Sequence, residues 1–116
     1  MKSAFSSLAL ATLAAACNAV VSGLNRPPVA IAGADQVIVL GQSIFLDASS
    51  SYDPEGDPLT YTWQVAVAPA GANVEEVLPA SECHRIKPIV QPDRAGLWLF
   101  RLTVNDGRND SVPDLM

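Results

Sequence analysis

The sequence predicts an all-β protein, and more closely an antiparallel β-sandwich. Short stretches of alternating apolar and polar residues, separated by Gly, Pro and Asp, follow one another after about residue 27. Two of these stretches, 59–64 and 97–105, place large aromatic side chains such as Trp63 and Phe100 on one face. A strand with an aromatic inner face requires a second sheet to cover it. No part of this region has apolar residues at the 3.6-residue period of a helix.

The length of 116 residues and the formal net charge of −5 limit the organisation of the chain and its partners. The length fits one domain of about 90 residues behind a targeting segment. We expect a signal peptide at 1–16, a lipidated cysteine and linker at 17–26, and the sandwich domain at 27–116. The acidic balance argues against nucleic acid as a partner, because binding to nucleic acid requires a basic face.

The first residues have the composition of an export signal. The run from Ala4 to Ala16 is apolar and uncharged, and its roughly 13 residues are too few to span a bilayer. Small residues stand directly before Cys17, and this arrangement resembles a bacterial lipobox, in which the cysteine is lipidated. Ordinary signal cleavage, for example after Ala19, and an uncleaved anchor are the alternatives. We expect an exported outer-membrane or cell-surface lipoprotein that contacts the membrane through its lipid anchor, and otherwise a periplasmic or secreted protein.

The expected strands follow from local alternation and from the turn residues that separate them. Phe45, Leu97 and Leu99 are expected to point outward, and Trp63 and Trp98 to lie in the core rather than to bind sugar. The acidic turn 53–58 precedes the strand that carries Trp63. In order, strands are expected at 29–32, 36–40 with Ile38 and Leu40 inward, 43–48 with Ile44 and Leu46 inward, 59–66 with Leu59, Tyr61 and Trp63 inward, 74–78, 85–90 interrupted by Pro88, 97–105 with Trp98, Phe100, Leu102 and Val104 inward, and a return strand within 108–116.

Several motifs follow one another in a fixed order. They are Arg26-Pro27-Pro28-Val29-Ala30, Ala32-Gly33-Ala34-Asp35-Gln36, Leu46-Asp47, the stretch from Ser50 to Trp63 with Asp53-Pro54-Glu55-Gly56-Asp57-Pro58, Pro92-Asp93-Arg94-Ala95-Gly96, and Leu102-Thr103-Val104-Asn105-Asp106-Gly107. Together they resemble the PKD (polycystic-kidney-disease-type) domain, in its bacterial PKD-like form and its K319L-like branch. The resemblance covers about Pro27 to Asp114 and implies an immunoglobulin-like sandwich, usually extracellular. Compared with the family, the C-terminal strand looks truncated.

The resemblance implies a non-catalytic module that binds a surface protein or polysaccharide or serves as a spacer at the cell surface. An accessory domain of a larger secreted or surface hydrolase and a calcium-stabilised structural module are the alternatives. The residues themselves do not suggest an enzyme. His84 is the only histidine, and neighbours on a strand such as Cys83 and His84 point to opposite faces, where they cannot form a nucleophile–base pair.

Calcium is the metal that the acidic turn suggests, because hard cations bind several oxygen ligands from flexible loops. Asp53, Glu55 and Asp57 crowd this one turn. Some PKD domains bind calcium near the N-terminal strand, and by that resemblance Asn25, Asp53 and Asp57 are the candidate ligands, with Asp106 ranked after them. The alternative is that the aspartates only cap the turn by accepting hydrogen bonds from backbone amides.

Overall fold

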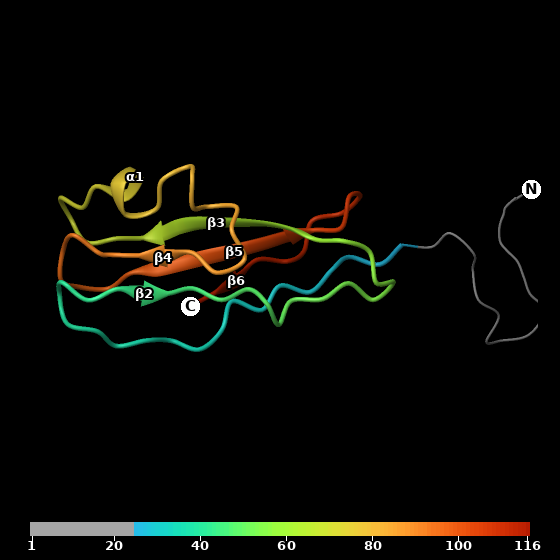
Figure 1. The fold of residues 1–116 in the computed structure, drawn as a ribbon, viewed down its shortest axis with the longest axis horizontal. Helices are drawn as coiled ribbons and strands as arrows, with labels where there is room; N and C mark the ends of the chain where they lie inside the picture. Colours follow the sequence, from blue (N-terminus) through green and yellow to red (C-terminus); the bar gives the residue numbers. More distant parts are fainter. Residues whose placement is uncertain (1–24) are drawn as a thin grey trace, which may run out of the picture.

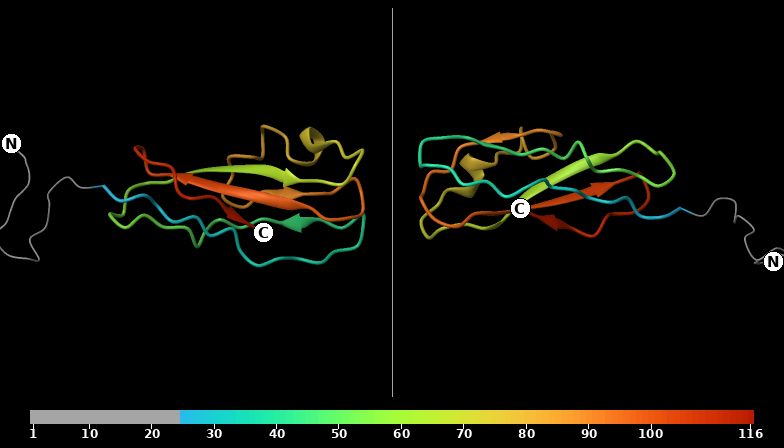
Figure 2. Two further views of the ribbon diagram at one scale, coloured as in Figure 1. Left: turned by 180° about the vertical axis from the view of Figure 1, so that it is seen from behind. Right: turned by 90° about the horizontal axis from the view of Figure 1, so that it is seen from below.

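A computed structural model of the chain describes residues 25–116, so the predicted signal peptide and Cys17 lie outside the described residues. Two antiparallel sheets make up the domain (Figure 1). One sheet has the order β3-β5-β6, formed by Thr60–Val67, Leu99–Asn105 and Asp114–Leu115, and the other pairs β2 (Ile44–Phe45) with β4 (Ile89–Val90). The views in Figure 2 show the strands running along the same long direction of the domain.

The β3–β5 pair is the longest ladder of the domain, and it sets the register of the core. Trp63 lies opposite Leu102, and a bulge between Val65 and Val67 interrupts the ladder near its end. Hydrogen bonds continue the shorter β2–β4 pair beyond its two strands, because the N–H groups of Leu46 and Ala48 donate to carbonyls in the opposite segment.

The core lies between the two sheets, as the alternation predicts. Trp63, Phe100, Leu102 and Val104 are buried on the inner face of β3 and β5, and side chains from β2, β4 and their flanks cover them. Trp98 is half-buried and stacks on Phe100, with ring centroids 6.2 Å apart. Phe45 and Leu97 are exposed, as expected, whereas Leu99, also expected outward, is half-buried. The predicted class, an all-β immunoglobulin-like sandwich, is therefore confirmed.

The strand predicted at 74–78 is wrong, because this segment forms the helical turn α1 (Val74–Val77). Asn73 caps the turn, and its side chain accepts a hydrogen bond from the backbone N–H of Glu76. Glu75 and Glu76 occupy the first turn, where carboxylates interact favourably with the free N–H groups. These capping interactions outweigh the apolar residues that suggested a strand.

The strand predicted at 36–40 is also absent from the described residues, and Leu40, expected inward, is 55% exposed. The side chain of Gln36 replaces the backbone ladder. Its amide donates to the carbonyl of Phe45 at 2.7 Å and accepts from the N–H of the same residue at 3.4 Å. The segment at 29–32 forms only an isolated bridge, between Val29 and Tyr52.

Residues 25–116 contain no helix with the length and hydropathy that a membrane span requires.

Candidate metal centre

Three segments that are far apart in the sequence meet at one end of the sandwich. These segments are the entry of the chain at Asn25, the acidic turn at 53–57 and the turn that follows β5 at Asp106 (Figure 1). The β5 ladder ends directly before Asp106, so the sheet carries this residue to the same end as the turn that precedes β3.

Asp53 builds the acidic turn with its own carboxylate. Its Oδ2 accepts hydrogen bonds from the backbone N–H groups of Glu55 at 3.0 Å and Asp57 at 2.9 Å. Gly56 takes a φ of 79°, a conformation that glycine adopts without strain. The turn-capping role that the sequence offered as an alternative is therefore present for Asp53. By contrast, the carboxylate of Asp57 accepts no hydrogen bond from any of residues 25–116.

Asp106 builds the turn after β5 in a similar way. Its Oδ1 accepts hydrogen bonds from the N–H groups of Arg108 at 2.9 Å and Asn109 at 2.8 Å. The side chain is only 7% exposed. The backbone N–H of Asn109, followed by the side-chain amide of Asn25, holds the pKa of the Asp106 carboxyl well below its usual range. Asp106 is therefore ionised at neutral pH.

The N-terminal segment is attached to both turns through two neighbouring residues. The amide nitrogen of Asn25 donates to Oδ2 of Asp106 at 2.7 Å. Arg26 donates from its guanidinium to Glu55 Oε2 at 2.7 Å and from its backbone N–H to Oε1 at 3.1 Å. The Arg26 guanidinium lowers the pKa of the Glu55 carboxyl. These contacts link residues 25–26 to the acidic turn at 53–57 and to the turn after β5.

Three carboxylates converge where these turns meet. Asp53, Asp57 and Asp106 each place one oxygen so that the three oxygens lie within 4.8 Å of one another. Oδ1 of Asp53 is buried and has no hydrogen-bond partner among the described residues. A buried carboxylate oxygen without a partner is costly, and a hard cation with oxygen ligands would satisfy it. The donor set therefore fits calcium.

The four predicted ligands take different positions in this cluster. Asp53, Asp57 and Asp106 lie together, whereas Asn25 presents its amide nitrogen to Asp106 and so orients that carboxylate. The sequence ranked Asp106 last, yet its side chain is buried and accepts hydrogen bonds from three residues. Arg26 was missed, although its place beside Asn25 was a signal that it could reach the same turn.

Cys83 and His84 lie in a turn and not on a strand, so the expectation that they point to opposite faces as strand neighbours is wrong. The pair nevertheless does not form a site of its own. Sγ of Cys83 donates to the carbonyl of Ala80 at 3.6 Å. Nδ1 of His84 lies 2.9 Å from the carbonyl of Tyr61. The two side chains thus engage different backbone groups.

Comparison with known proteins gives two matches. The family described as "K319L-like, PKD domain" matches residues 32–115. Dyslexia-associated protein KIAA0319 of Homo sapiens is 36% identical over 83 residues, which cover 71% of this chain and 7% of that protein. The chain thus corresponds to a small part of the length of this relative. No solved structure gives a match.

Proposed function

Since the chain belongs to the K319L-like PKD domain family, we propose that it is a non-catalytic, calcium-stabilised extracellular module. PKD domains are generally non-catalytic modules that lie outside the cell or at its surface. The proposal adds that calcium binds at Asp53, Asp57 and Asp106 and stiffens the end of the sandwich at which the chain enters. The observation that carries it is that one carboxylate oxygen from each of Asp53, Asp57 and Asp106 lies within 4.8 Å of the other two. In addition, Asp53 Oδ1 is buried and has no hydrogen-bond partner among residues 25–116.

Calcium at this position would connect the N-terminal segment to the sandwich. Asn25 already contacts Asp106 in the turn after β5, and Arg26 contacts Glu55 in the acidic turn at 53–57. The cation would neutralise the repulsion among the three carboxylates and fix both turns. In a spacer or binding module, this fixed geometry would set the direction in which the domain projects from whatever precedes it.

Thermal unfolding with and without calcium tests the metal proposal. Extracellular calcium modules bind with dissociation constants of about 10⁻⁴ to 10⁻³ M. At about 10 mM calcium, this affinity stabilises the folded state by about 1.4 to 2.7 kcal/mol relative to the protein in chelator. For a domain of this size, we expect a Tm increase of at least about 6 °C.

The exposed carboxylate of Glu75 lies far along the chain in α1, so Glu75→Gln is the matched control and should keep the full increase in Tm. Identical melting curves in calcium and in chelator would refute the proposal.

We also propose that Cys17 carries a lipid and holds the module at the outer membrane or cell surface, where it contacts a surface protein or polysaccharide. The support is the apolar run from Ala4 to Ala16 directly before this cysteine. Mass spectrometry of the N-terminal peptide from native cells tests it. A diacylglycerol-modified Cys17 is expected, and an unmodified N-terminus at Val20 would rule out the anchor.

A further inference from the structure

An ion pair connects the N-terminal segment to the acidic turn at 53–57. Nε of the Arg26 guanidinium donates to Glu55 Oε2 at 2.7 Å, and the backbone N–H of Arg26 donates to Glu55 Oε1 at 3.1 Å. One residue therefore engages both oxygens of this carboxylate. The Arg26 side chain is 64% exposed and the Glu55 side chain 25% exposed, so the guanidinium lies closer to solvent than the carboxylate that it holds.

Glu55 belongs to the same turn as two of the three clustered carboxylates, Asp53 and Asp57. Its backbone N–H donates to Asp53 Oδ2 at 3.0 Å, so the turn places Glu55 between these two candidate ligands. The Arg26 side chain lowers the pKa of the Glu55 carboxyl, while the Asp106 carboxylate acts weakly in the opposite direction. Glu55 therefore lies within the electrostatic reach of both the cation and the cluster.

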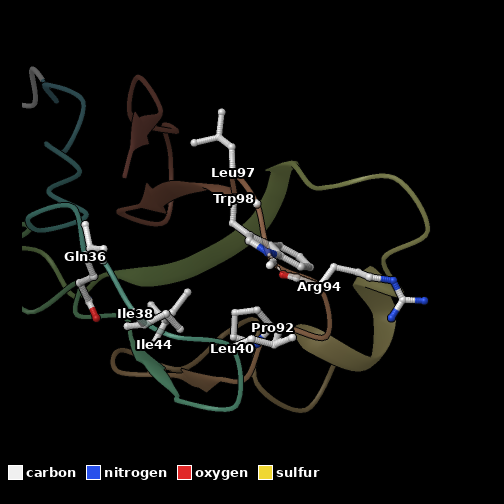
Figure 3. Close-up of a pocket in the computed structure, with 11 residues that line it drawn as sticks. Gln36, Ile38, Leu40, Ile44, Pro92, Arg94, Leu97 and Trp98 are labelled. Carbon is white, nitrogen blue, oxygen red and sulfur yellow. Dashed lines mark hydrogen bonds between the residues drawn. The ribbon is translucent and has the colours of Figure 1, made fainter.

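The three clustered aspartates supply fewer oxygens than calcium takes. Calcium binds about six to eight oxygen ligands, and carboxylates are the strongest of them. Glu55 is the remaining carboxylate of the turn at 53–57. The apolar pocket in Figure 3 offers nothing comparable, because Arg94 is the one charged side chain in its lining. Among residues 25–116, an additional carboxylate for this cation is thus present at the acidic turn, but Arg26 occupies it.

We propose that Arg26 withholds Glu55 from calcium and thereby sets the affinity of the site. The inference rests on the proposed calcium site and adds the residue that regulates it. In the metal-free protein, the guanidinium neutralises Glu55. When calcium binds, Glu55 Oε2 becomes a ligand and the guanidinium moves into solvent, while the backbone N–H of Arg26 keeps Oε1 and the segment stays attached. Opening this ion pair costs little, because the guanidinium is already mostly exposed.

Calcium titration followed by NMR shifts of the backbone amides at 53–57 tests the proposal. Arg26→Met keeps a long side chain but removes its charge and its donor, and it should raise the affinity for calcium about tenfold. Arg85→Met is the matched control. Arg85 donates to Glu82 at 3.1 Å, the two side chains are 63% and 24% exposed, and neither residue belongs to the two turns. This control should bind calcium as the wild type does.

The same substitution in a Glu55→Gln background separates the withholding of Glu55 from simple charge repulsion. If Arg26 acts by holding this carboxylate, Arg26→Met should raise the affinity about tenfold when Glu55 is present. In the Glu55→Gln background, the rise should be at most about twofold, because only repulsion between the guanidinium and the cation remains. Equal rises in the two backgrounds, or no rise in either, would overturn the proposal.

The Nε–H resonance of Arg26 gives a second readout on the wild type. Saturating calcium should shift this resonance and speed its exchange with solvent, since the hydrogen bond to Glu55 Oε2 is lost. Calcium-dependent shifts at 53–57 together with an unchanged Arg26 Nε–H would overturn this inference and leave the calcium site in place. The absence of calcium-dependent shifts in all of these proteins would overturn the calcium site as well.

Discussion

Replacing Asp53 by asparagine separates the two roles of its side chain. The amide oxygen of the asparagine can still accept the hydrogen bonds that Oδ2 takes from the N–H groups of Glu55 and Asp57. The substitution removes the negative charge and replaces the second oxygen by an NH₂ group. The turn cap therefore survives, while the cation loses a ligand.

The expected change in the free energy of unfolding follows from the spacing of the carboxylates. Two unit charges separated by the 4.8 Å that bounds this cluster repel by about 0.9 kcal/mol in water and about 3.5 kcal/mol at an effective dielectric constant of 20. Asp53 is half-buried and Asp106 is buried, so the repulsion lies between these two values. In chelator, we expect Asp53→Asn to be as stable as the wild type or up to about 3.5 kcal/mol more stable. In calcium at 10 to 100 times the dissociation constant, the wild type gains about 1.4 to 2.7 kcal/mol, which the variant lacks.

From chelator to calcium, the stability of the wild type relative to the variant is therefore expected to rise by about 1.4 to 2.7 kcal/mol. Urea unfolding followed by tryptophan fluorescence measures it, since Trp63 is buried in the core. Chelator and calcium are compared at equal ionic strength, so that screening of the carboxylates by salt does not imitate binding. A variant that is less stable than the wild type by the same amount in both conditions would show that Asp53 only caps the turn, and the argument for calcium would fail.

Three further predictions concern the core, a close contact and pH. Trp63→Phe removes buried ring atoms and the indole N–H that donates to a backbone carbonyl at 3.1 Å. Urea unfolding should show that the free energy of unfolding falls by about 2 to 3 kcal/mol. A decrease below about 1 kcal/mol would contradict the packing of this side chain. Gly96→Ala would place a Cβ 2.9 Å from Cγ of Pro69. Gly41 also has a positive φ, but a Cβ at that position would have no atom within 4 Å. Calorimetry should therefore give a larger decrease in Tm for Gly96→Ala than for Gly41→Ala, and equal decreases would argue against the contact with Pro69. The lowered pKa of the Asp106 carboxyl stabilises the fold above the unfolded-state pKa of about 4, and this stability is lost as the pH falls below that value. Unfolding free energies measured in chelator should therefore fall less steeply below about pH 4 in Asp106→Asn than in the wild type, and parallel curves would refute the role of this carboxylate.

Local alternation was sufficient to predict the central strands. The inward residues of β3 and β5, namely Trp63, Phe100, Leu102 and Val104, are buried as expected. The two-residue period fixes which side chains share a face, and the aromatic residues show which face needs covering. These properties depend on neighbouring residues only, so they can be read without knowing the partner strand.

The peripheral elements could not be predicted in the same way. Segment 36–40 has the composition of a strand, but the Gln36 side chain occupies the backbone groups of Phe45 that a strand would use. The segment at 74–78 became the helical turn α1 because Asn73 caps it. In both cases a side chain bonds the backbone, and its effect depends on geometry that composition does not contain.

The sequence by itself determined the sandwich, its inner face and the acidic turn at 53–58, because these follow from spacing along the chain. Only the tertiary structure decided what this turn can do. It brought Asp106 to Asp53 and Asp57, turned the amide nitrogen of Asn25 toward Asp106, and left one Asp53 oxygen buried without a hydrogen-bond partner among residues 25–116. Such features depend on which atoms meet after folding, and the order of residues does not specify those distances.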